Sequence, residues 1–440
     1  MITDLVNRPE IKIIKPITEQ KWYSLLYDNK SKLAENATDV YEEAIQGQVT
    51  TCSKVFRKPI SVITGGAGTG KTTVLEKLMK AMESASGDSE SFCLLAPTGK
   101  AADRIREKTG REAVTIHSFL TKRNWMRENF TYRFENGRKE SDFTTYIIDE
   151  TSMMDLSLFA AFIRSVNWNK TKRLILVGDA NQLPPIGRGK VFDDIIQFLK
   201  LDEPDAIGKL EHNLRQLLNK VNKSGNGILR LASLYIQENL TGDNASLAKA
   251  EAEKVIQEIQ LDEFDKDVSF SFWRDKEELD SKINELLDTL KSQEIYIDNT
   301  QILSPYRGEY FGTESLNVSV QRHFNSFNLD KKGNFNGVTL FDKVIQFRNR
   351  TGSDSYYSYN SQTRSNSRVE VYNGEIGRVY YHSFDKDKYK GFYYHLKSKS
   401  SNGFQVRFER KSNHLITFNS DNSVAENIEL AYAISIHKAQ

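Results

Sequence analysis

Cysteine is scarce in this chain, because only Cys52 and Cys93 occur among its 440 residues. Two cysteines cannot build a disulfide framework, which indicates a reducing compartment and predicts a cytoplasmic protein. Long apolar runs are also missing, since none approaches the roughly 18 residues that a membrane-spanning helix needs. The first residues lack the charged and then apolar pattern of a signal peptide. The seven histidines are scattered and form no cluster with metal-ligand spacing.

What the chain has is an ordinary globular composition with an uneven distribution of charge. Hydrophobic residues make up 38% and charged residues 27%, and the net charge is only +2. At about 150 residues per domain, the length predicts two or more domains. Acidic residues outnumber basic ones by 14 to 7 from Ser246 to Glu294, whereas basic residues outnumber acidic ones by 14 to 6 from Lys343 to Lys411.

The basic segment also holds nine of the 19 tyrosines. Cations interleaved with aromatic rings suit a nucleic-acid surface, because cations meet phosphates while rings stack on bases. The alternative is a solvated β-rich surface whose tyrosines are half-buried strand residues.

A phosphate-binding loop is the most informative motif. Residues Ser61–Thr73 fit a strand that runs into a glycine-rich loop and then a helix, with the G-x-x-x-x-G-K-[ST] spacing. Glycines let backbone N–H groups surround phosphate oxygens, and the helix N-terminus adds partial positive charge. We expect Lys71 to reach the β- and γ-phosphates and Thr72 to hold Mg²⁺. The predicted nucleotide cradle consists of Gly66, Ala67, Gly68, Thr69, Gly70, Lys71, Thr72 and Thr73.

Short apolar strands alternate with helical stretches from residue 60 to about 200. The predicted strands are Ile60–Thr64, Phe92–Ala96, Tyr146–Asp149 and Arg173–Gly178. Strands of this kind, each followed by a loop and a helix, predict the α/β class with a parallel sheet.

Two carboxylates end the third predicted strand. An isolated Asp-Glu pair is usually a solvated loop end, but this one follows an apolar strand downstream of a phosphate loop. There Asp149 can hold Mg²⁺, and Glu150 can orient and deprotonate the attacking water. The next strand leads into a loop in which Gln182 is placed to sense the γ-phosphate.

The second half of the chain indicates short strands and tight turns. Turn signals occur at Lys332-Gly333, Asn373-Gly374 and Asn402-Gly403. They predict a small β-barrel inserted into a second α/β domain, which resumes at Asn427–Ile436. The Ser/Asn/Tyr-rich stretch Gly352–Ser367 is predicted to be a mobile loop.

Further motifs follow in a fixed order. They are Ala96–Ala102 (APTGKAA), Thr115–Leu120 (TIHSFL), Gly178–Pro185 (GDANQLPP), Leu210–Gln216 (LEHNLRQ), Val371–Gly377 (VYNGEIG) and Glu429–Gln440 (ELAYAISIHKAQ). Over roughly residues 40–440 this series resembles the RecD-like superfamily 1 helicases of the 5′-to-3′ branch. The resemblance implies an ATP-dependent DNA helicase with two RecA-like P-loop domains, the second interrupted by an SH3-like β-barrel.

The resemblance also implies roles for single residues. Arg215 would act as an arginine finger in catalysis with Lys71, Glu150 and Gln182, and Gln48 would read the adenine of ATP, with Gln46 as a near neighbour. DNA contacts are implied for Pro97, Thr98, Lys100, His117, Asn373 and His437. The implied partner is single-stranded DNA, or duplex DNA with a 5′ single-stranded tail, bound by a monomer in repair, recombination or defence.

The expected organisation has five parts. They are a helical lead-in (1–50), a first RecA-like domain (51–225) with a hairpin insert near 122–142, an acidic helical connector (226–298), a second RecA-like domain (299–330 and 424–440) and the barrel (331–423). The insert, Phe130–Ser141 with a turn near Asn136-Gly137, is either a strand-separating pin or a surface hairpin.

Two departures from the family pattern stand out. Ser435 stands where the family usually has Thr, so the hydroxyl is retained. The family continues beyond the position of Gln440 with a closing helix and strand and a second arginine finger, so the second domain is expected to be incomplete. The alternative function is an ATP- and DNA-binding module that is inactive by itself. A nucleotide kinase or GTPase would not need these motifs in this order.

Overall fold

The structure is a computed structural model. It describes residues 1–12, 17–86, 90–127, 131–214, 217, 227–234, 244–261, 263–265, 267–332, 334–380, 404–418 and 421–436. The chain forms two compact units, Met1–Phe270 and Ser271–Gln440. Their boundary falls inside the predicted connector 226–298, and the finer division into domains stays a prediction.

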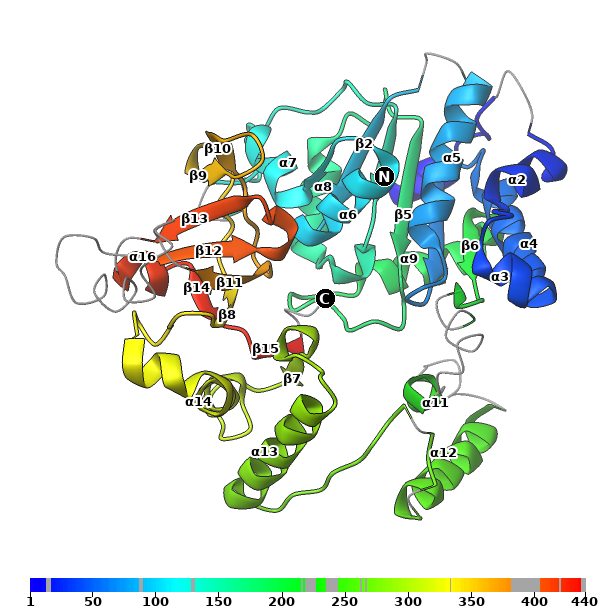
Figure 1. The fold of residues 1–440 in the computed structure, drawn as a ribbon. Helices are drawn as coiled ribbons and strands as arrows, with labels where there is room; N and C mark the ends of the chain where they lie inside the picture. The colour runs from blue at the N-terminus through cyan, green and yellow to red at the C-terminus, as the bar shows by residue number, and fades with distance from the viewer. Residues whose placement is uncertain are drawn as a thin grey trace. The chain divides into compact units, whose positions relative to one another are not determined.

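A six-stranded parallel sheet forms the centre of the first unit (Figure 1). The strand order is β3-β2-β4-β5-β1-β6, and every pairing is parallel. The strands are β1 (Ile60–Gly65), β2 (Phe92–Ala96), β3 (Ala113–Thr115), β4 (Thr145–Ile148), β5 (Arg173–Gly178) and β6 (Ile207–Leu210). The predicted α/β class with a parallel sheet is confirmed. The third predicted strand is shifted by one residue, because β4 begins at Thr145 and ends at Ile148, so Asp149 lies just beyond it.

Alternate residues of the strands face two separate hydrophobic cores. On β4, Ile147 lies in one core, whereas Tyr146 and Ile148 lie in the other. The first core is covered by α2 (Glu19–Leu26), α3 (Lys32–Asn36), α4 (Thr38–Val55), α5 (Lys71–Ser86) and α6 (Gly99–Thr109); the second is covered by α1 (Ile2–Val6), α7 (Ile116–Lys122), α8 (Leu156–Ser165) and α9 (Val191–Asp202). Burial on both faces explains why these strands are almost continuously apolar.

Two more helices complete the described part of the first unit. They are α11 (Gly227–Ser233) and α12 (Asn244–Gln260). Arg230 of α11 joins them through ion pairs with Glu251 at 3.1 Å and Glu258 at 2.7 Å.

The second unit combines an antiparallel sheet with two long helices. Its seven-stranded sheet has the order β10-β9-β13-β12-β11-β8-β14, and a separate parallel pair joins β15 to β7. The elements are α13 (Lys276–Ser292), β7 (Ile302–Ser304), α14 (Thr313–Lys332), β8 (Lys343–Gln346), β9 (Tyr356–Asn360), β10 (Ser365–Val369), β11 (Ile376–Tyr380), β12 (Phe404–Phe408), β13 (His414–Phe418), α16 (Asp421–Ala425), β14 (Ile428–Leu430) and β15 (Ala433–Ser435). The SH3-like barrel and the second RecA-like domain stay predictions.

The stretch Gly352–Ser367 forms a hairpin where we predicted a mobile loop. Tyr356–Asn360 pairs with Ser365–Val369 in antiparallel register. Tyr356 and Ser358 are buried while Tyr357 is exposed, so the polar composition reflects a strand with one solvated face.

The described part of the predicted insert is irregular. Among residues 131–141, Tyr132 forms an isolated antiparallel bridge with Met126. These described residues form no antiparallel ladder of greater length. The indole N–H of Trp125 donates to the carbonyl of Arg138 at 3.0 Å, and buried Glu140 pairs with Arg123. These contacts join residues 138–140 to the residues at the end of α7. Across all described residues, none of the helices has the length and apolar character that crossing a membrane requires.

Candidate nucleotide and DNA site

Glycine conformation shapes the predicted phosphate loop between β1 and α5. Gly68 and Gly70 have φ angles of 81° and 88°, a region that side chains with a Cβ rarely adopt. Gly65 allows a close approach, since a Cβ there would lie 2.7 Å from the carbonyl oxygen of Leu210 on β6. The motif therefore uses glycine for backbone shape and for packing against the neighbouring strand.

The Lys71 ammonium lies inside this loop. Its Nζ donates to the carbonyl oxygens of Gly65 at 2.7 Å and Gly66 at 3.0 Å. The Thr69 hydroxyl donates to the Gly66 carbonyl at 2.9 Å and fixes the bend. Lys71 begins α5, so Thr72 and Thr73 occupy its first turn, where free backbone N–H groups attract anions.

Two amide side chains support the loop from outside. Gln48 of α4 is 3% exposed, and its Nε2 donates to the Thr69 carbonyl at 3.4 Å. Asn213 donates from Nδ2 to the Ala67 carbonyl at 2.7 Å. Sequence reasoning missed the Asn213 contact, because it depends on a fold that joins residues 146 positions apart. The predicted finger Arg215 lies outside the described residues.

Asp149 and Glu150 follow β4 in different environments. Asp149 is 4% exposed, whereas Glu150 has the left-handed φ of 52° and a side chain that is 18% exposed. The Glu150 backbone N–H donates to Asp149 Oδ1 at 2.9 Å. Burial, and then the charge of Glu150, raises the pKa of Asp149 to about 6, although Lys71 and Arg104 oppose the shift.

Arg104 on α6 is the cation that contacts Glu150. Its Nη1 lies 3.6 Å from Glu150 Oε1, and its side chain is 50% exposed. The other carboxylate oxygen, Oε2, is buried and finds no hydrogen-bond partner in the described part of the chain. Sequence reasoning missed Arg104, because an arginine on a helix gives no signal of which carboxylate it faces.

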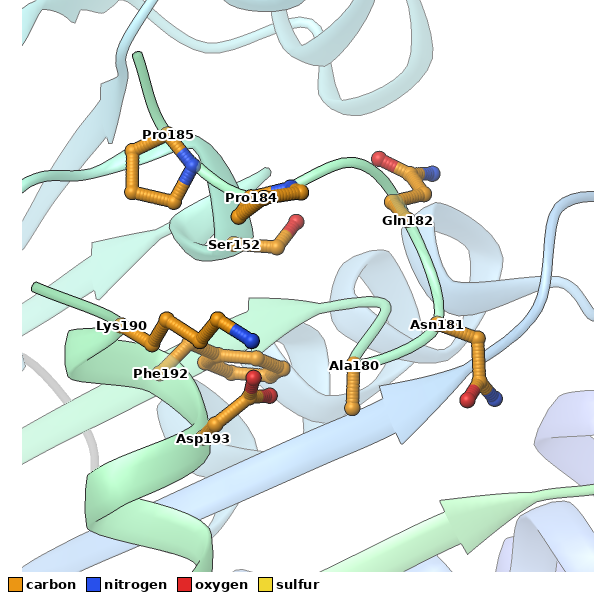
Figure 2. A pocket seen from close by; sticks show the side chains of 9 residues that line it. All are labelled: Ser152, Ala180, Asn181, Gln182, Pro184, Pro185, Lys190, Phe192 and Asp193. Atoms are coloured by element: carbon orange, nitrogen blue, oxygen red, sulfur yellow. The ribbon is translucent and has the colours of Figure 1, made fainter. Parts of the chain in front are cut away.

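Gln182 borders a pocket beyond the end of β5. The pocket has a volume of about 210 Å³ and is lined by Ser152, Ala180, Asn181, Gln182, Pro184, Pro185, Lys190, Phe192 and Asp193 (Figure 2). The Gln182 backbone N–H donates to the Asp179 carbonyl at 3.2 Å, which turns the loop directly after the strand. Ser152, two residues after Glu150, lines this pocket together with the Gln182 loop.

The candidate DNA residues of the first unit follow neighbouring strands. Pro97, Thr98 and Lys100 lie at the junction of β2 and α6, where the Thr98 hydroxyl caps the helix by accepting from the Ala101 N–H at 3.2 Å. His117 lies in the first turn of α7, directly after β3. Burial lowers the pKa of His117, although the charge of Asp155 opposes the shift.

Asn373 is the described DNA candidate of the second unit. It is exposed beside Gly374, whose φ of 91° makes the predicted turn, and its N–H donates to Asn349 Oδ1 at 2.8 Å. His437 lies outside the described residues. Of the basic residues in this unit, Arg378 pairs with Asp298, and Arg368 donates to the Ser353 carbonyl at 2.8 Å.

The phosphate loop, the carboxylates and the DNA candidates of the first unit all follow the carboxyl ends of parallel strands. These ends meet at one edge of the sheet, which is where open α/β sheets bind ligands. Within the described residues, no three His, Cys, Asp or Glu side chains gather as a metal cage. The fold and site define a P-loop NTPase.

Comparison with known proteins shows what this chain is similar to. The AAA domain family matches residues 48–188. The RecBCD enzyme subunit RecD of Mycolicibacterium smegmatis is 34% identical over 160 residues, which cover 32% of this chain and 28% of that protein. The ATP-dependent RecD2 DNA helicase of Deinococcus radiodurans is 26% identical over 402 residues, or 89% of this chain and 43% of that protein. These relatives show that the chain is similar to RecD-like helicases over part of their length, which agrees with the resemblance that its motifs carry.

Two further matches cover almost the whole chain. An uncharacterized protein of Methanocaldococcus jannaschii is 29% identical over 97% of this chain and 37% of its own length. The chain thus spans about two fifths of these long relatives. The crystal structure of a Bacteroides Pif1 helicase with ADP-AlF3 and ssDNA aligns with 93% of this chain and 83% of that chain, at a TM-score of 0.37 and 18% identity. A likeness at this level carries no inference about function.

Proposed function

We propose that this chain is an ATP-dependent DNA helicase or translocase that moves 5′ to 3′ along single-stranded DNA. The observation that carries the proposal is the shared sheet edge: the phosphate loop follows β1, Asp149 and Glu150 follow β4, and Pro97–Lys100 follow β2. ATP chemistry and DNA contact would therefore act on one rigid sheet. Relatives named RecD2 DNA helicase and RecD support this assignment, and the direction rests on the family resemblance.

In this proposal Lys71 binds the β- and γ-phosphates, Glu150 accepts a proton from the attacking water, and Gln182 senses the γ-phosphate. Arg215 acts as the arginine finger, and Gln48 contributes to adenine binding. The remaining loop residues hold phosphate oxygens through their backbone N–H groups. Gln48 would act from behind the loop, since its amide contacts Thr69.

The residues fit a divalent cation at the carboxylates. A buried Asp149 with a raised pKa, next to a Glu150 oxygen without a described partner, is an anionic pair that a cation would stabilise. Asp149 and the Thr72 hydroxyl would hold it. When bound, Mg²⁺ supplies positive charge to the phosphate oxygens of the nucleotide.

The proposed partner is single-stranded DNA, or duplex DNA with a 5′ single-stranded tail, bound by a monomer. Pro97, Thr98, Lys100 and His117 would contact it from the first unit, and Asn373 and His437 from the second. Such contacts act mainly on the phosphate backbone, so sequence preference should be weak. A cytoplasmic role in repair, recombination or defence completes the proposal.

Strand displacement tests the proposal directly. Labelled duplexes with a 5′ tail, a 3′ tail or no tail are incubated with the protein and ATP. We expect ATP-dependent unwinding of the 5′-tailed duplex, and none with Lys71→Ala, because the lost ammonium served phosphate. Unwinding of the 3′-tailed duplex alone would contradict the direction. ATP turnover without any strand displacement would favour a module that needs a partner.

A further inference from the structure

Helix α6 connects the candidate DNA residues to the candidate general base. Thr98 caps the helix, Lys100 lies in its first turn, and Arg104 lies four residues later. Residues four apart share one face of a helix, and they are about 6 Å apart along its axis. A ligand that pulls on the start of α6 therefore displaces the guanidinium of Arg104 as well.

The neighbours of Arg104 distinguish it from the other arginine of this helix. Arg106 contacts α6 itself and the next strand, because it pairs with Asp103 and donates to the Ala113 carbonyl. Arg104 instead reaches the segment after β4, where Glu150 Oε1 lies 3.6 Å from Nη1. At that distance the guanidinium attracts the carboxylate without a short hydrogen bond. An ion pair whose cation is half exposed to solvent contributes little stability.

The carboxylate that Arg104 contacts must be free in order to work. A general base has to accept a proton from water placed within hydrogen-bond reach. While Oε1 faces Arg104, one of the two oxygens is turned toward α6. The pair would thus restrain the side chain on which turnover depends, without contributing to nucleotide binding by the phosphate loop.

We propose that Arg104 is a positioning residue: its ion pair restrains Glu150, and single-stranded DNA bound at Pro97–Lys100 shifts α6 and releases it. DNA stimulation of ATP hydrolysis would then pass through one helix of the first unit. This inference rests on the proposed function, because it assigns a residue to the DNA-dependent step of the same reaction.

The test compares ATP turnover with and without oligo-dT for the wild type, Arg104→Gln, Arg104→Lys and Lys108→Gln. Arg104→Gln should raise the DNA-free rate by about two- to five-fold, the range of a partly exposed ion pair. Its rate with DNA and its KM for ATP should stay unchanged. The stimulation ratio, which is the rate with DNA divided by the rate without DNA, should therefore fall by the same factor. Arg104→Lys keeps the charge and should restore most of the ratio. Lys108→Gln removes an exposed cation from the same helix and is the matched control.

Binding of labelled oligo-dT separates this role from a direct DNA contact. We expect Arg104→Gln to bind oligo-dT as tightly as the wild type. An unchanged DNA-free rate combined with weaker DNA binding would overturn the inference, and so would an unchanged stimulation ratio. If the wild type is stimulated by DNA and only the Arg104 result fails, the proposed function stands. A wild-type ATPase that DNA does not stimulate would overturn both.

Discussion

At the scale of single residues, burial separates the two carboxylates that follow β4. Asp149 is almost fully buried, whereas Glu150 keeps some exposure and faces Arg104. An acid with a raised pKa in the folded protein binds its proton more tightly than the unfolded chain does. Folding stability therefore falls as the pH rises through the window between the two pKa values.

This argument predicts the effect of Asp149→Asn on stability. The window runs from the ordinary value of 3.8 to about 6, so ionised Asp149 destabilises the fold at neutral pH. The amide should raise the unfolding free energy by about 1–3 kcal/mol at pH 8. The gain should shrink as the pH falls from 6 toward 4. Chemical denaturation across this range measures it, with Glu107→Gln, an exposed carboxylate on α6, as the control. A gain that is the same at every pH would contradict the pKa argument.

At the scale of elements, the sequence predicts strands well where both faces are buried. β2 and β5 begin and end at the predicted residues. In a parallel sheet, a continuous apolar segment between polar loops indicates a strand that is buried on both faces. The hairpin of β9 and β10 was missed because its polar residues alternate with buried ones. The turn at Asn336-Gly337, with φ angles of 52° and 79° between bridged Phe335 and Val338, also went unnoticed, although Asn-Gly is a strong hairpin signal.

The residues of the candidate site that belong to sequence motifs were predictable. Strand-loop spacing was enough to expect Lys71 and the two carboxylates near one sheet edge. The supporting contacts of Asn213 and Arg104 were not predictable, since they join distant segments through single side chains. Such contacts depend on the packing of α6 and of the segment after β6, which no local pattern specifies.

A buried ion pair lies at the amino ends of β2, β4 and β5, away from the candidate site at their carboxyl ends. Glu90 and Arg173 are 2.7 Å apart with fully buried side chains, and the hydroxyl of Thr145 also donates to Glu90 at 3.1 Å. Burial raises the pKa of Glu90, but the charge and hydrogen bond of Arg173 outweigh it, and the net shift is downward.

Removing one partner should leave a buried, unpaired charge. We expect Glu90→Gln to lower the unfolding free energy by about 3 kcal/mol. The matched control is Glu83→Gln, which breaks a half-exposed pair with Arg111 at 2.7 Å and should cost less than about 1 kcal/mol. Urea titrations of both variants measure the difference. Equal losses of unfolding free energy in the two variants would contradict the claim that burial makes the Glu90 pair more costly to break.

At the scale of the whole molecule, charge is the property through which the proposed DNA contacts would act. Binding to phosphates releases counterions, so affinity should fall as salt rises. The basic segment of the second unit is partly occupied by its own contacts, because Arg368 and Arg378 have partners within that unit. Lys100 is a predicted DNA contact in the first turn of α6, so a charge test can be made there.

We expect Lys100→Gln to weaken binding of single-stranded DNA and to flatten the slope of log affinity against log salt by about 0.7. Fluorescence anisotropy with labelled oligo-dT at several salt concentrations gives the slope. Lys108→Gln changes the net charge equally and should leave the slope near the wild-type value. A slope unchanged by Lys100→Gln would place the DNA elsewhere.

The central claim is that Glu150 is the general base of a DNA-stimulated ATPase, and one measurement tests it most directly. ATP turnover is measured for the wild type and Glu150→Gln, with and without oligo-dT, together with nucleotide binding. We predict that DNA stimulates the wild type, and that Glu150→Gln still binds ATP with Mg²⁺ but no longer turns it over, because Asp149 and Lys71 remain. Near-normal turnover by Glu150→Gln would contradict the assignment of this site.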